Sequence, residues 1–383
     1  MKNTKMVYRL KQIYLFLFVF FFYLYRAISD SNLKFALSFL LLLLSALSGV
    51  AYLSLKRKVR SKIAIMLIPF IILVSFVFVK FDFSDTRLIM LFLAGLVFAN
   101  EDEENVVKIA LISRIILTFA IVILFGGFGQ RNGIGAHIGT ILLLYMCLNK
   151  DKLDMKKWLL IFIGVLLLWY INPENAGVIV VLLVALMLQL IRKFNFWKKL
   201  LCSKATEFVF PICLFVTWFL SESINATEMP LIGAILPQSV NSAYLGFVRR
   251  LNLLLGTRLS LAKTGLNRMG IHVFDANAYF EGYLELLQDA ANRNAYFIVD
   301  SGYILLLIKW GLLVSVVVCI MSILTMKYYI SIRAYNFVIA GIVLAVWSVL
   351  EDHIFYSFVL MFWGKAFIEL RNIKKERRNF SSE

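Results

Sequence analysis

Six cationic side chains lie in one polar stretch of an otherwise apolar chain. The stretch runs from Asn225 to Phe297 and contains Arg249, Arg250, Arg258, Lys263, Arg268 and Arg293. Guanidinium groups bind phosphates and carboxylates through paired hydrogen bonds, and they stay charged at every physiological pH. The cluster therefore suggests that this stretch binds an anionic ligand. The alternative for any one residue is a cation that lies over an amphipathic helix at a membrane surface.

The rest of the sequence indicates which elements must position this stretch. Hydrophobic residues make up 61% of the chain and charged residues 16%, and the mean hydropathy is +0.83. Such a composition is typical of polytopic membrane proteins and excludes an ordinary soluble domain. We therefore expect an all-α polytopic membrane protein with about twelve transmembrane helices. The apolar segments lie near Ile13–Tyr25, Leu33–Leu53, Ile63–Val79, Leu88–Ala99, Val106–Phe125, Ile138–Leu148, Trp158–Ile171, Val178–Ile191, Phe208–Leu220, Ile298–Leu324, Phe337–Leu350 and Ile354–Phe367.

Basic residues set the expected orientation of these segments. Lysine and arginine collect in alternate connections, around Lys58, Lys156 and Lys198, and at both ends of the chain. Because positive charge marks the cytoplasmic side, both termini are expected in the cytoplasm and the cationic stretch outside it. This topology accounts for most of the net charge of +17, so nucleic acid is not an expected partner.

The expected organisation has four parts. Residues 1–220 carry transmembrane helices 1 to 9, and residues 221–297 form one large extracytoplasmic loop with interfacial helices. Residues 298–370 carry helices 10 to 12, and residues 371–383 form a cytoplasmic tail. The protein is thus expected to be a multi-pass protein of the cytoplasmic membrane.

The loop shows helical spacing that is interrupted at one glycine. Leu245, Val248 and Leu255 recur at near-helical spacing, which favours a short helix at the membrane interface. Gly256 interrupts this helix just before Arg258. Because glycine permits a sharp bend, it can fix the arginine where the guanidinium can grip a phosphate. We predict that this bend positions Arg258.

Several stretches of the sequence share the pattern of a known family. Residues 251–261 read Leu-Asn-Leu-Leu-Leu-Gly-Thr-Arg-Leu-Ser-Leu and continue to Gly-Ile-His-Val-Phe-Asp at 270–275. Residues 299–305 read Val-Asp-Ser-Gly-Tyr-Ile-Leu, and Trp-Gly-Leu-Leu follows at 310–313. Residues 131–137 run from an arginine to a histidine, and Glu351 precedes the last apolar segment. These features resemble the Wzy-type polymerases of capsular, O-antigen and exopolysaccharide repeat units, which are related to O-antigen ligases.

The resemblance implies a GT-C-like fold and a defined reaction. In this family a growing glycan on undecaprenyl pyrophosphate is transferred, at the outer face, to the non-reducing end of a lipid-linked repeat unit. The reaction needs stabilisation of the leaving group, a base for the acceptor hydroxyl and a groove for the polyprenyl tail. The implied partners are undecaprenyl-pyrophosphate-linked oligosaccharides and membrane lipid, together with a flippase and a chain-length regulator. No cofactor is implied.

Arginines of the outer connections are the expected ligands of the pyrophosphate. We expect Arg258 and Arg131 to bind it, with Arg249 or Arg250 assisting, because a guanidinium stabilises the leaving group without a metal. An interfacial anchor is the alternative for Arg131.

A carboxylate is the expected base. Asp300 stands where the loop re-enters the membrane, and partial desolvation there can raise its pKa. Its alternative is a helix N-cap. Tyr303, one turn later, can orient the acceptor or the carboxylate, or belong to an interfacial aromatic belt. His137 is a candidate phosphate ligand or alternative base, and Glu351 can hold an arginine or a sugar hydroxyl.

Other chemistries have weaker support in the sequence. The three histidines are scattered without the paired spacing of a zinc motif, so no metal site is assigned. The alternatives to a polymerase are a glycosyltransferase similar to O-antigen ligases and a flippase or transporter of lipid-linked oligosaccharides. One dominant outer loop argues against a transporter, because transporters commonly have two similar halves.

Overall fold

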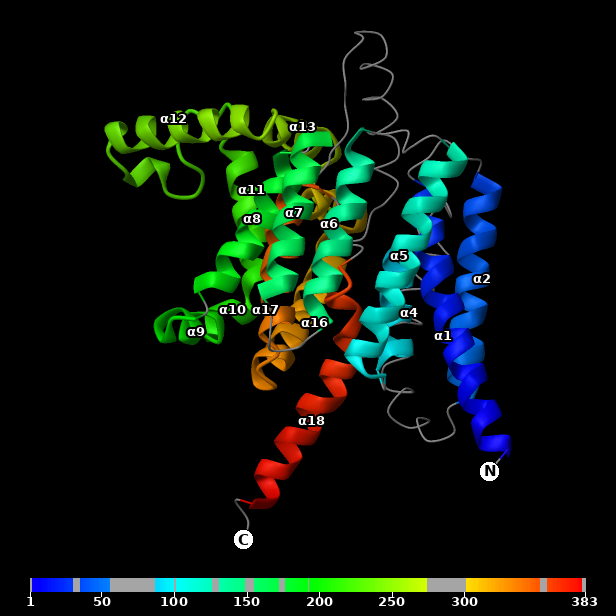
Figure 1. Ribbon diagram of the computed structural model, residues 1–383. Coiled ribbons are helices and arrows are strands. Elements are labelled where there is room, and N and C mark those ends of the chain that lie inside the picture. The colour runs from blue at the N-terminus through cyan, green and yellow to red at the C-terminus, as the bar shows by residue number, and fades with distance from the viewer. Residues whose placement is uncertain are drawn as a thin grey trace. The chain divides into compact units, whose positions relative to one another are not determined.

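A computed structural model describes residues 2–29, 35–55, 87–99, 101–125, 131–148, 155–171, 176–191, 193–273, 301–351 and 357–380. Within these ranges the chain is all-α, as its composition predicts, and contains no strand (Figure 1). The N-terminal half comprises α1 (Lys2–Ser29), α2 (Phe35–Ser54), α4 (Arg87–Phe98), α5 (Glu103–Phe125), α6 (Arg131–Cys147), α7 (Met155–Ile171) and α8 (Ala176–Ile191). The remaining elements are α9 (Asn195–Leu201), α10 (Lys204–Glu207), α11 (Val209–Glu222), η1 (Gly233–Ile235), α12 (Gln238–Leu254), α13 (Arg258–Met269), α15 (Gly302–Leu305), η2 (Leu306–Trp310), α16 (Gly311–Ser331), α17 (Tyr335–Leu350), η4 (Leu360–Phe362) and α18 (Trp363–Phe380).

These helices coincide with the apolar segments of the sequence. A helix covers all or part of each predicted segment except Ile63–Val79, which lies outside the described residues. Helix α6 begins at Arg131, well before the predicted start at Ile138. The residues from Arg131 to His137 therefore belong to a helix, whereas the sequence analysis placed Arg131 in an outer connection. Glycine is common in membrane helices, where it allows neighbouring helices to approach closely.

Within the residues that the structure describes, two helical stretches are long and apolar enough to cross a membrane by length and composition. They are Met6–Leu24 and Gly302–Ser331. Shorter apolar helices are present at Leu40–Ser54, Gly135–Cys147, Val209–Glu222 and Tyr335–Leu350. These stretches suggest association with a membrane, and the number of about twelve spans stays a prediction.

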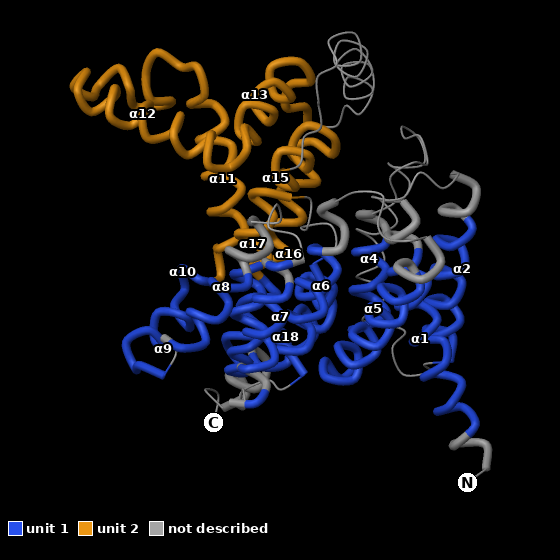
Figure 2. The backbone as a smooth tube through the Cα atoms, turned by 45° about the horizontal axis from the view of Figure 1, so that its top comes forward, with its two compact units in different colours: residues 1–206, 324–343, 357–383 blue, residues 207–323, 344–356 orange. Residues whose placement is uncertain are grey.

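The chain forms two compact units (Figure 2). Unit 1 comprises residues 1–206, 324–343 and 357–383, and unit 2 comprises residues 207–323 and 344–356. The whole cationic stretch therefore belongs to unit 2, together with α11 and the first part of α16.

Unit 1 is a set of helices that pack side by side. Helix α1 contacts α2 and α5, α5 contacts α6, and α6 contacts α7 and α8. A buried carboxylate, Glu103, lies in the first turn of α5, where it accepts hydrogen bonds from Tyr328 at 2.5 Å and from Lys365 at 2.9 Å. Burial acts to raise the pKa of Glu103, but these two bonds outweigh burial and lower it. The cluster fastens α5 to α16 and α18.

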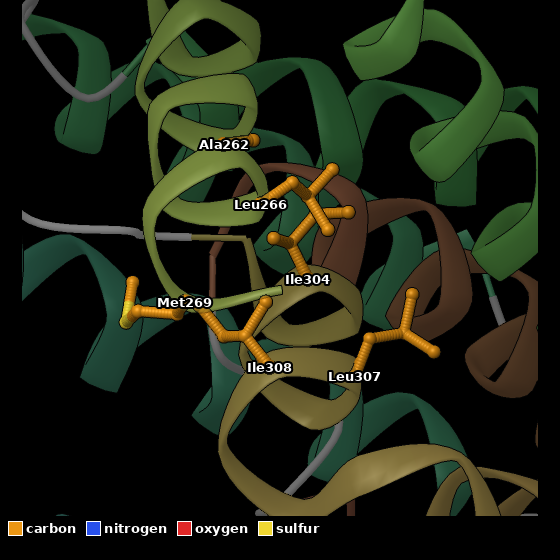
Figure 3. Packing of buried hydrophobic residues seen from close by; sticks show 6 residues of the cluster. All are labelled: Ala262, Leu266, Met269, Ile304, Leu307 and Ile308. Atoms are coloured by element: carbon orange, nitrogen blue, oxygen red, sulfur yellow. The ribbon is translucent and has the colours of Figure 1, made fainter. Parts of the chain in front are cut away.

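Unit 2 is built around the helices of the cationic stretch. Helix α12 lies crosswise to α11 (Figure 1). One apolar cluster joins α13 to α15 and η2 (Figure 3) and consists of Ala262, Leu266, Met269, Ile304, Leu307 and Ile308. A second cluster joins the chain just after α11 to α12 and α13 and consists of Ile224, Val248 and Leu259. Burial of these side chains fixes α13, whose first residue is Arg258.

Candidate functional site

The predicted bend at Gly256 is present and sets the position of Arg258. Gly256 and Thr257 lie between α12 and α13 with φ angles of 62° and 64°. A β-branched residue in this left-handed region is strained by about 1–3 kcal/mol, so the surrounding structure must hold it there. Asn252 does so, because its backbone oxygen accepts the N–H of Thr257 at 2.8 Å. Its side-chain amide also donates to the Ser260 hydroxyl at 2.7 Å and accepts the Ser260 N–H at 3.1 Å.

Arg258 faces a carboxylate from the end of α17. Its Nη2 atom lies 3.8 Å from Oε1 of Glu351, and the two side chains are 21% and 16% exposed. At this separation the groups form an ion pair without a hydrogen bond. The other carboxylate oxygen, Oε2, accepts a hydrogen bond at 3.1 Å from the indole N–H of Trp347, a buried residue. The carboxylate is therefore anchored through one oxygen while the other faces the arginine.

The helix that begins at Gly302 is fastened to the same end of α17. The N–H of Gly302 donates to the backbone oxygen of Glu351 at 3.1 Å. The hydroxyl of Tyr303 donates to the backbone oxygen of Ala345 at 3.0 Å, and Tyr303 is fully buried. The phenol thus binds backbone in this structure, whereas Asp300, the expected base, lies outside the described residues.

The start of α16 is tied to the chain that follows α13. Gly311 has a φ of 79°, and the N–H of the next residue, Leu312, donates to the backbone oxygen of His272 at 2.8 Å. A Cβ at position 311 would lie 2.6 Å from that same oxygen. Only glycine fits such a close approach, which gives a physical reason for a glycine at the start of α16.

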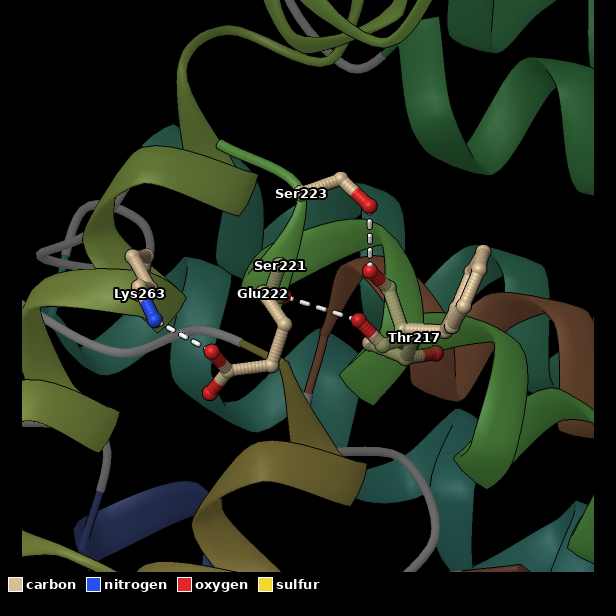
Figure 4. Close-up of polar contacts among 6 residues, drawn as sticks. Thr217, Ser221, Glu222, Ser223 and Lys263 are labelled. Atoms are coloured by element: carbon tan, nitrogen blue, oxygen red, sulfur yellow. Dashed lines mark hydrogen bonds and ion pairs between the residues drawn. The ribbon is translucent and has the colours of Figure 1, made fainter. Parts of the chain in front are cut away.

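The other cations of the stretch have different surroundings. Lys263 of α13 forms an ion pair with Glu222 at the end of α11, beside the Ser221 and Thr217 turn (Figure 4). This lysine ties α13 to α11. Arg249 and Arg250 are exposed on α12, and Arg268 is exposed in the last turn of α13. Arg293 lies outside the described residues.

His137 lies in unit 1, where it contacts a buried arginine that the sequence analysis did not select. Nη1 of Arg114 is 3.0 Å from Nδ1 of His137, and both residues are 2% exposed. The guanidinium carbon of Arg114 also lies 4.2 Å from the centre of the Tyr23 ring, a cation–π arrangement. Arg131 opens α6, and its side chain is outside the described part of the chain. An arginine within the apolar segment 106–125 was the signal that could have identified this cluster.

The structure thus brings Arg258 and Glu351 together, with the start of α15 fastened beside them. Trp347 was missed because a tryptophan in an apolar segment gives no sign that its N–H binds a carboxylate. Among the residues that the structure describes, no group of three or more His, Cys, Asp or Glu side chains could hold a metal ion. A partly exposed guanidinium held at a fixed bend can bind a phosphate oxygen.

Comparison with family models, with curated proteins and with solved structures finds no match for this chain.

Proposed function

We propose that this protein is a polysaccharide polymerase of the Wzy type, which joins repeat units linked to undecaprenyl pyrophosphate. The observation that carries the proposal is the partly exposed Arg258, held at a bend and 3.8 Å from the anchored carboxylate of Glu351. A cation in a fixed position stabilises charge on a leaving group without rearranging during the reaction. The resemblance of the residues around Arg258 and Glu351 to that family adds support.

The proposed reaction divides the work between a cation and a base. The acceptor hydroxyl attacks the anomeric carbon of the growing glycan while a base, Asp300 in this proposal, removes its proton. The bond from that carbon to the pyrophosphate breaks, and its electron pair leaves on the phosphate oxygen. Arg258 stabilises this negative charge through paired N–H groups.

Glu351 has a proposed role in substrate exchange. Because its contact with Arg258 is longer than a hydrogen bond, a phosphate oxygen can replace the carboxylate at the guanidinium. The carboxylate, still held by Trp347, then accepts a hydrogen bond from a sugar hydroxyl. Arg249 and Arg250 are proposed to assist by attracting the anionic donor to this face of unit 2.

The proposed location is the cytoplasmic membrane, with about twelve spans and both termini in the cytoplasm. The apolar stretches Met6–Leu24 and Gly302–Ser331 support insertion, and the basic connections support the orientation. A flippase would deliver the lipid-linked repeat unit to the outer leaflet, and a chain-length regulator would limit the product.

Deletion of the gene in the native host tests this function. A polymerase deletion should accumulate a single repeat unit on undecaprenyl pyrophosphate in the outer leaflet, and the intact gene should restore the polymer. Accumulation confined to the inner leaflet would contradict the proposal and indicate a flippase. Accumulation of long lipid-linked polymer would contradict it as well, and would indicate a ligase.

A further inference from the structure

The segment between α11 and α12 forms a turn that is held by hydrogen bonds. The N–H of Gly233 donates to the backbone oxygen of Met229 at 2.8 Å, closing the turn. Asn241 of α12, which is 5% exposed, reaches into it: its amide oxygen accepts the N–H of Met229 at 3.1 Å, and its amide nitrogen donates to the Gly233 oxygen at 2.8 Å. A Cβ at Gly233 would lie 2.7 Å from the Cβ of Glu228. The turn is therefore closely packed on its inner side.

Its outer side exposes large apolar side chains. Leu231 is 71% exposed, Ile232 44% and Ile235 85%. Leu231 also has a φ of 68°, a left-handed conformation that leucine rarely adopts. No charged residue occurs between Met229 and Leu236. We name the segment Met229–Leu236 the apolar hook. A strained and well-bonded turn that directs apolar groups outward suggests a surface that contacts something apolar.

The apolar hook and the end of α11 pack on the same face of α12. The buried residues of α12 are Asn241, Leu245, Val248 and Asn252, at spacings that place them along one side of the helix. Asn241 holds the apolar hook, and Val248 packs against Ile224, just past the end of α11. Helix α12 lies crosswise to α11, and the hook lies on the same side of α12 as α11 (Figure 1).

We propose that the apolar hook inserts into the lipid bilayer beside α11, at the boundary between headgroups and acyl chains. The proposal rests on the membrane topology of the proposed function, in which α11 crosses the bilayer. Helix α11 itself exposes Ile212, Phe215 and Val216, which would face lipid in that topology, so an inserted hook would enter the same apolar layer. The exposed Arg249, adjacent to Val248 on α12, supplies a cation that suits lipid phosphates.

Spin labels on the full-length protein in phosphatidylethanolamine and phosphatidylglycerol vesicles test this insertion. The label is placed at Ile235→Cys, in a background whose four native cysteines are replaced. Collision with lipid-soluble oxygen should exceed collision with a water-soluble nickel chelate several-fold. Phe247→Cys is the matched control, because Phe247 is 58% exposed but lies about 200° around α12 from the buried Leu245. Its label should collide mainly with the nickel chelate.

A third label at Val216→Cys separates this proposal from the topology on which it rests. If the Val216 label is in lipid and the Ile235 label is in water, the insertion of the hook is wrong and the topology stands. If both are in water, α11 does not cross the bilayer and both proposals fail. Protection of the Ile235 label from both reagents would indicate a protein contact and would also overturn the proposal. Photoreactive amino acids at the same positions, in the chain with its native cysteines, give the same comparison through lipid adducts.

Discussion

Arg258→Lys is the substitution that most directly tests the candidate site. Lysine keeps the positive charge opposite Glu351 but loses the planar, paired N–H groups that match two phosphate oxygens. If Arg258 only balances Glu351, the ammonium should replace it well, because the observed separation of 3.8 Å involves charge and no hydrogen bond. If Arg258 binds the pyrophosphate, the exchange should reduce polymer formation strongly.

The losses of rate expected for these two roles of Arg258 differ enough to be distinguished. Two unit charges at this distance attract by about 4 kcal/mol at an effective dielectric constant of about 20, before desolvation is subtracted. Partly exposed ion pairs retain about 1 kcal/mol or less, which corresponds to about a fivefold effect. Loss of one preorganised stabiliser of a transition-state charge costs about 2.7 kcal/mol, or about 10²-fold in rate. We therefore expect a loss of about 10²-fold in rate with little change in stability.

The assay is the rate of polymer formation from lipid-linked repeat units at equal protein abundance, with thermal unfolding measured in parallel. Arg268→Lys is the matched control, since Arg268 is an exposed arginine of the same helix and should tolerate the change. A double variant, Arg258→Glu with Glu351→Arg, restores the ion pair in reverse. Recovery of activity in that variant, or near-normal activity of Arg258→Lys, would refute a role for Arg258 in pyrophosphate binding.

Three further substitutions test the structure around the site and in unit 1. Trp347→Phe removes the indole N–H that holds Glu351 and should reduce the rate of polymer formation at least about tenfold, because a hydrogen bond to a charged group contributes about 1.5–3 kcal/mol. An unchanged rate would contradict the anchoring role. Tyr303→Phe should lower the free energy of unfolding by about 1 kcal/mol through loss of the bond to the Ala345 oxygen, and a loss of activity without loss of stability would instead favour a role in substrate orientation. Because the pKa of Glu103 is lowered in the folded state, its stabilising contribution is complete above the unfolded pKa of about 4.3 and is lost as the pH falls through the lower folded value. The unfolding temperature should therefore fall less steeply on acidification in Glu103→Gln than in the natural protein, and parallel curves would contradict this.

The helices were predictable because their signal is local. An apolar run of the length of a membrane helix needs no distant partner, and α11 at Val209–Glu222 agrees closely with the predicted segment Phe208–Leu220. The bend at Gly256 was predictable for the same reason, since glycine acts on its own backbone. The start of α6 was missed because the glycines after Arg131 weaken the helical pattern, and the tertiary structure overrides such a local preference.

The contacts of the candidate site depend on tertiary structure and were only partly predictable. The sequence offered Glu351 as a partner for an arginine or a sugar hydroxyl, but the pairing with Arg258 requires α13 and α17 to meet. Trp347 and Glu351 are four residues apart, a spacing that brings side chains together on a helix. The sequence alone does not show that the indole N–H donates to this carboxylate. The contact between Arg114 and His137 joins two helices, and no pattern within either helix specifies it.

The surroundings of the arginines separate those that stabilise the fold from those that can meet a ligand. Arg114 is 2% exposed and enclosed by His137 and the Tyr23 ring, so a ligand cannot reach its guanidinium without displacing core side chains. Arg249 is accessible on α12, but exposure leaves a long side chain many rotamers, and ordering them on binding costs free energy. Arg258 combines access with restraint, because it is 21% exposed and starts a helix behind a strained, hydrogen-bonded bend. This combination lowers the entropy lost on binding an anion, and for that reason Arg258 is the strongest candidate among the described cations.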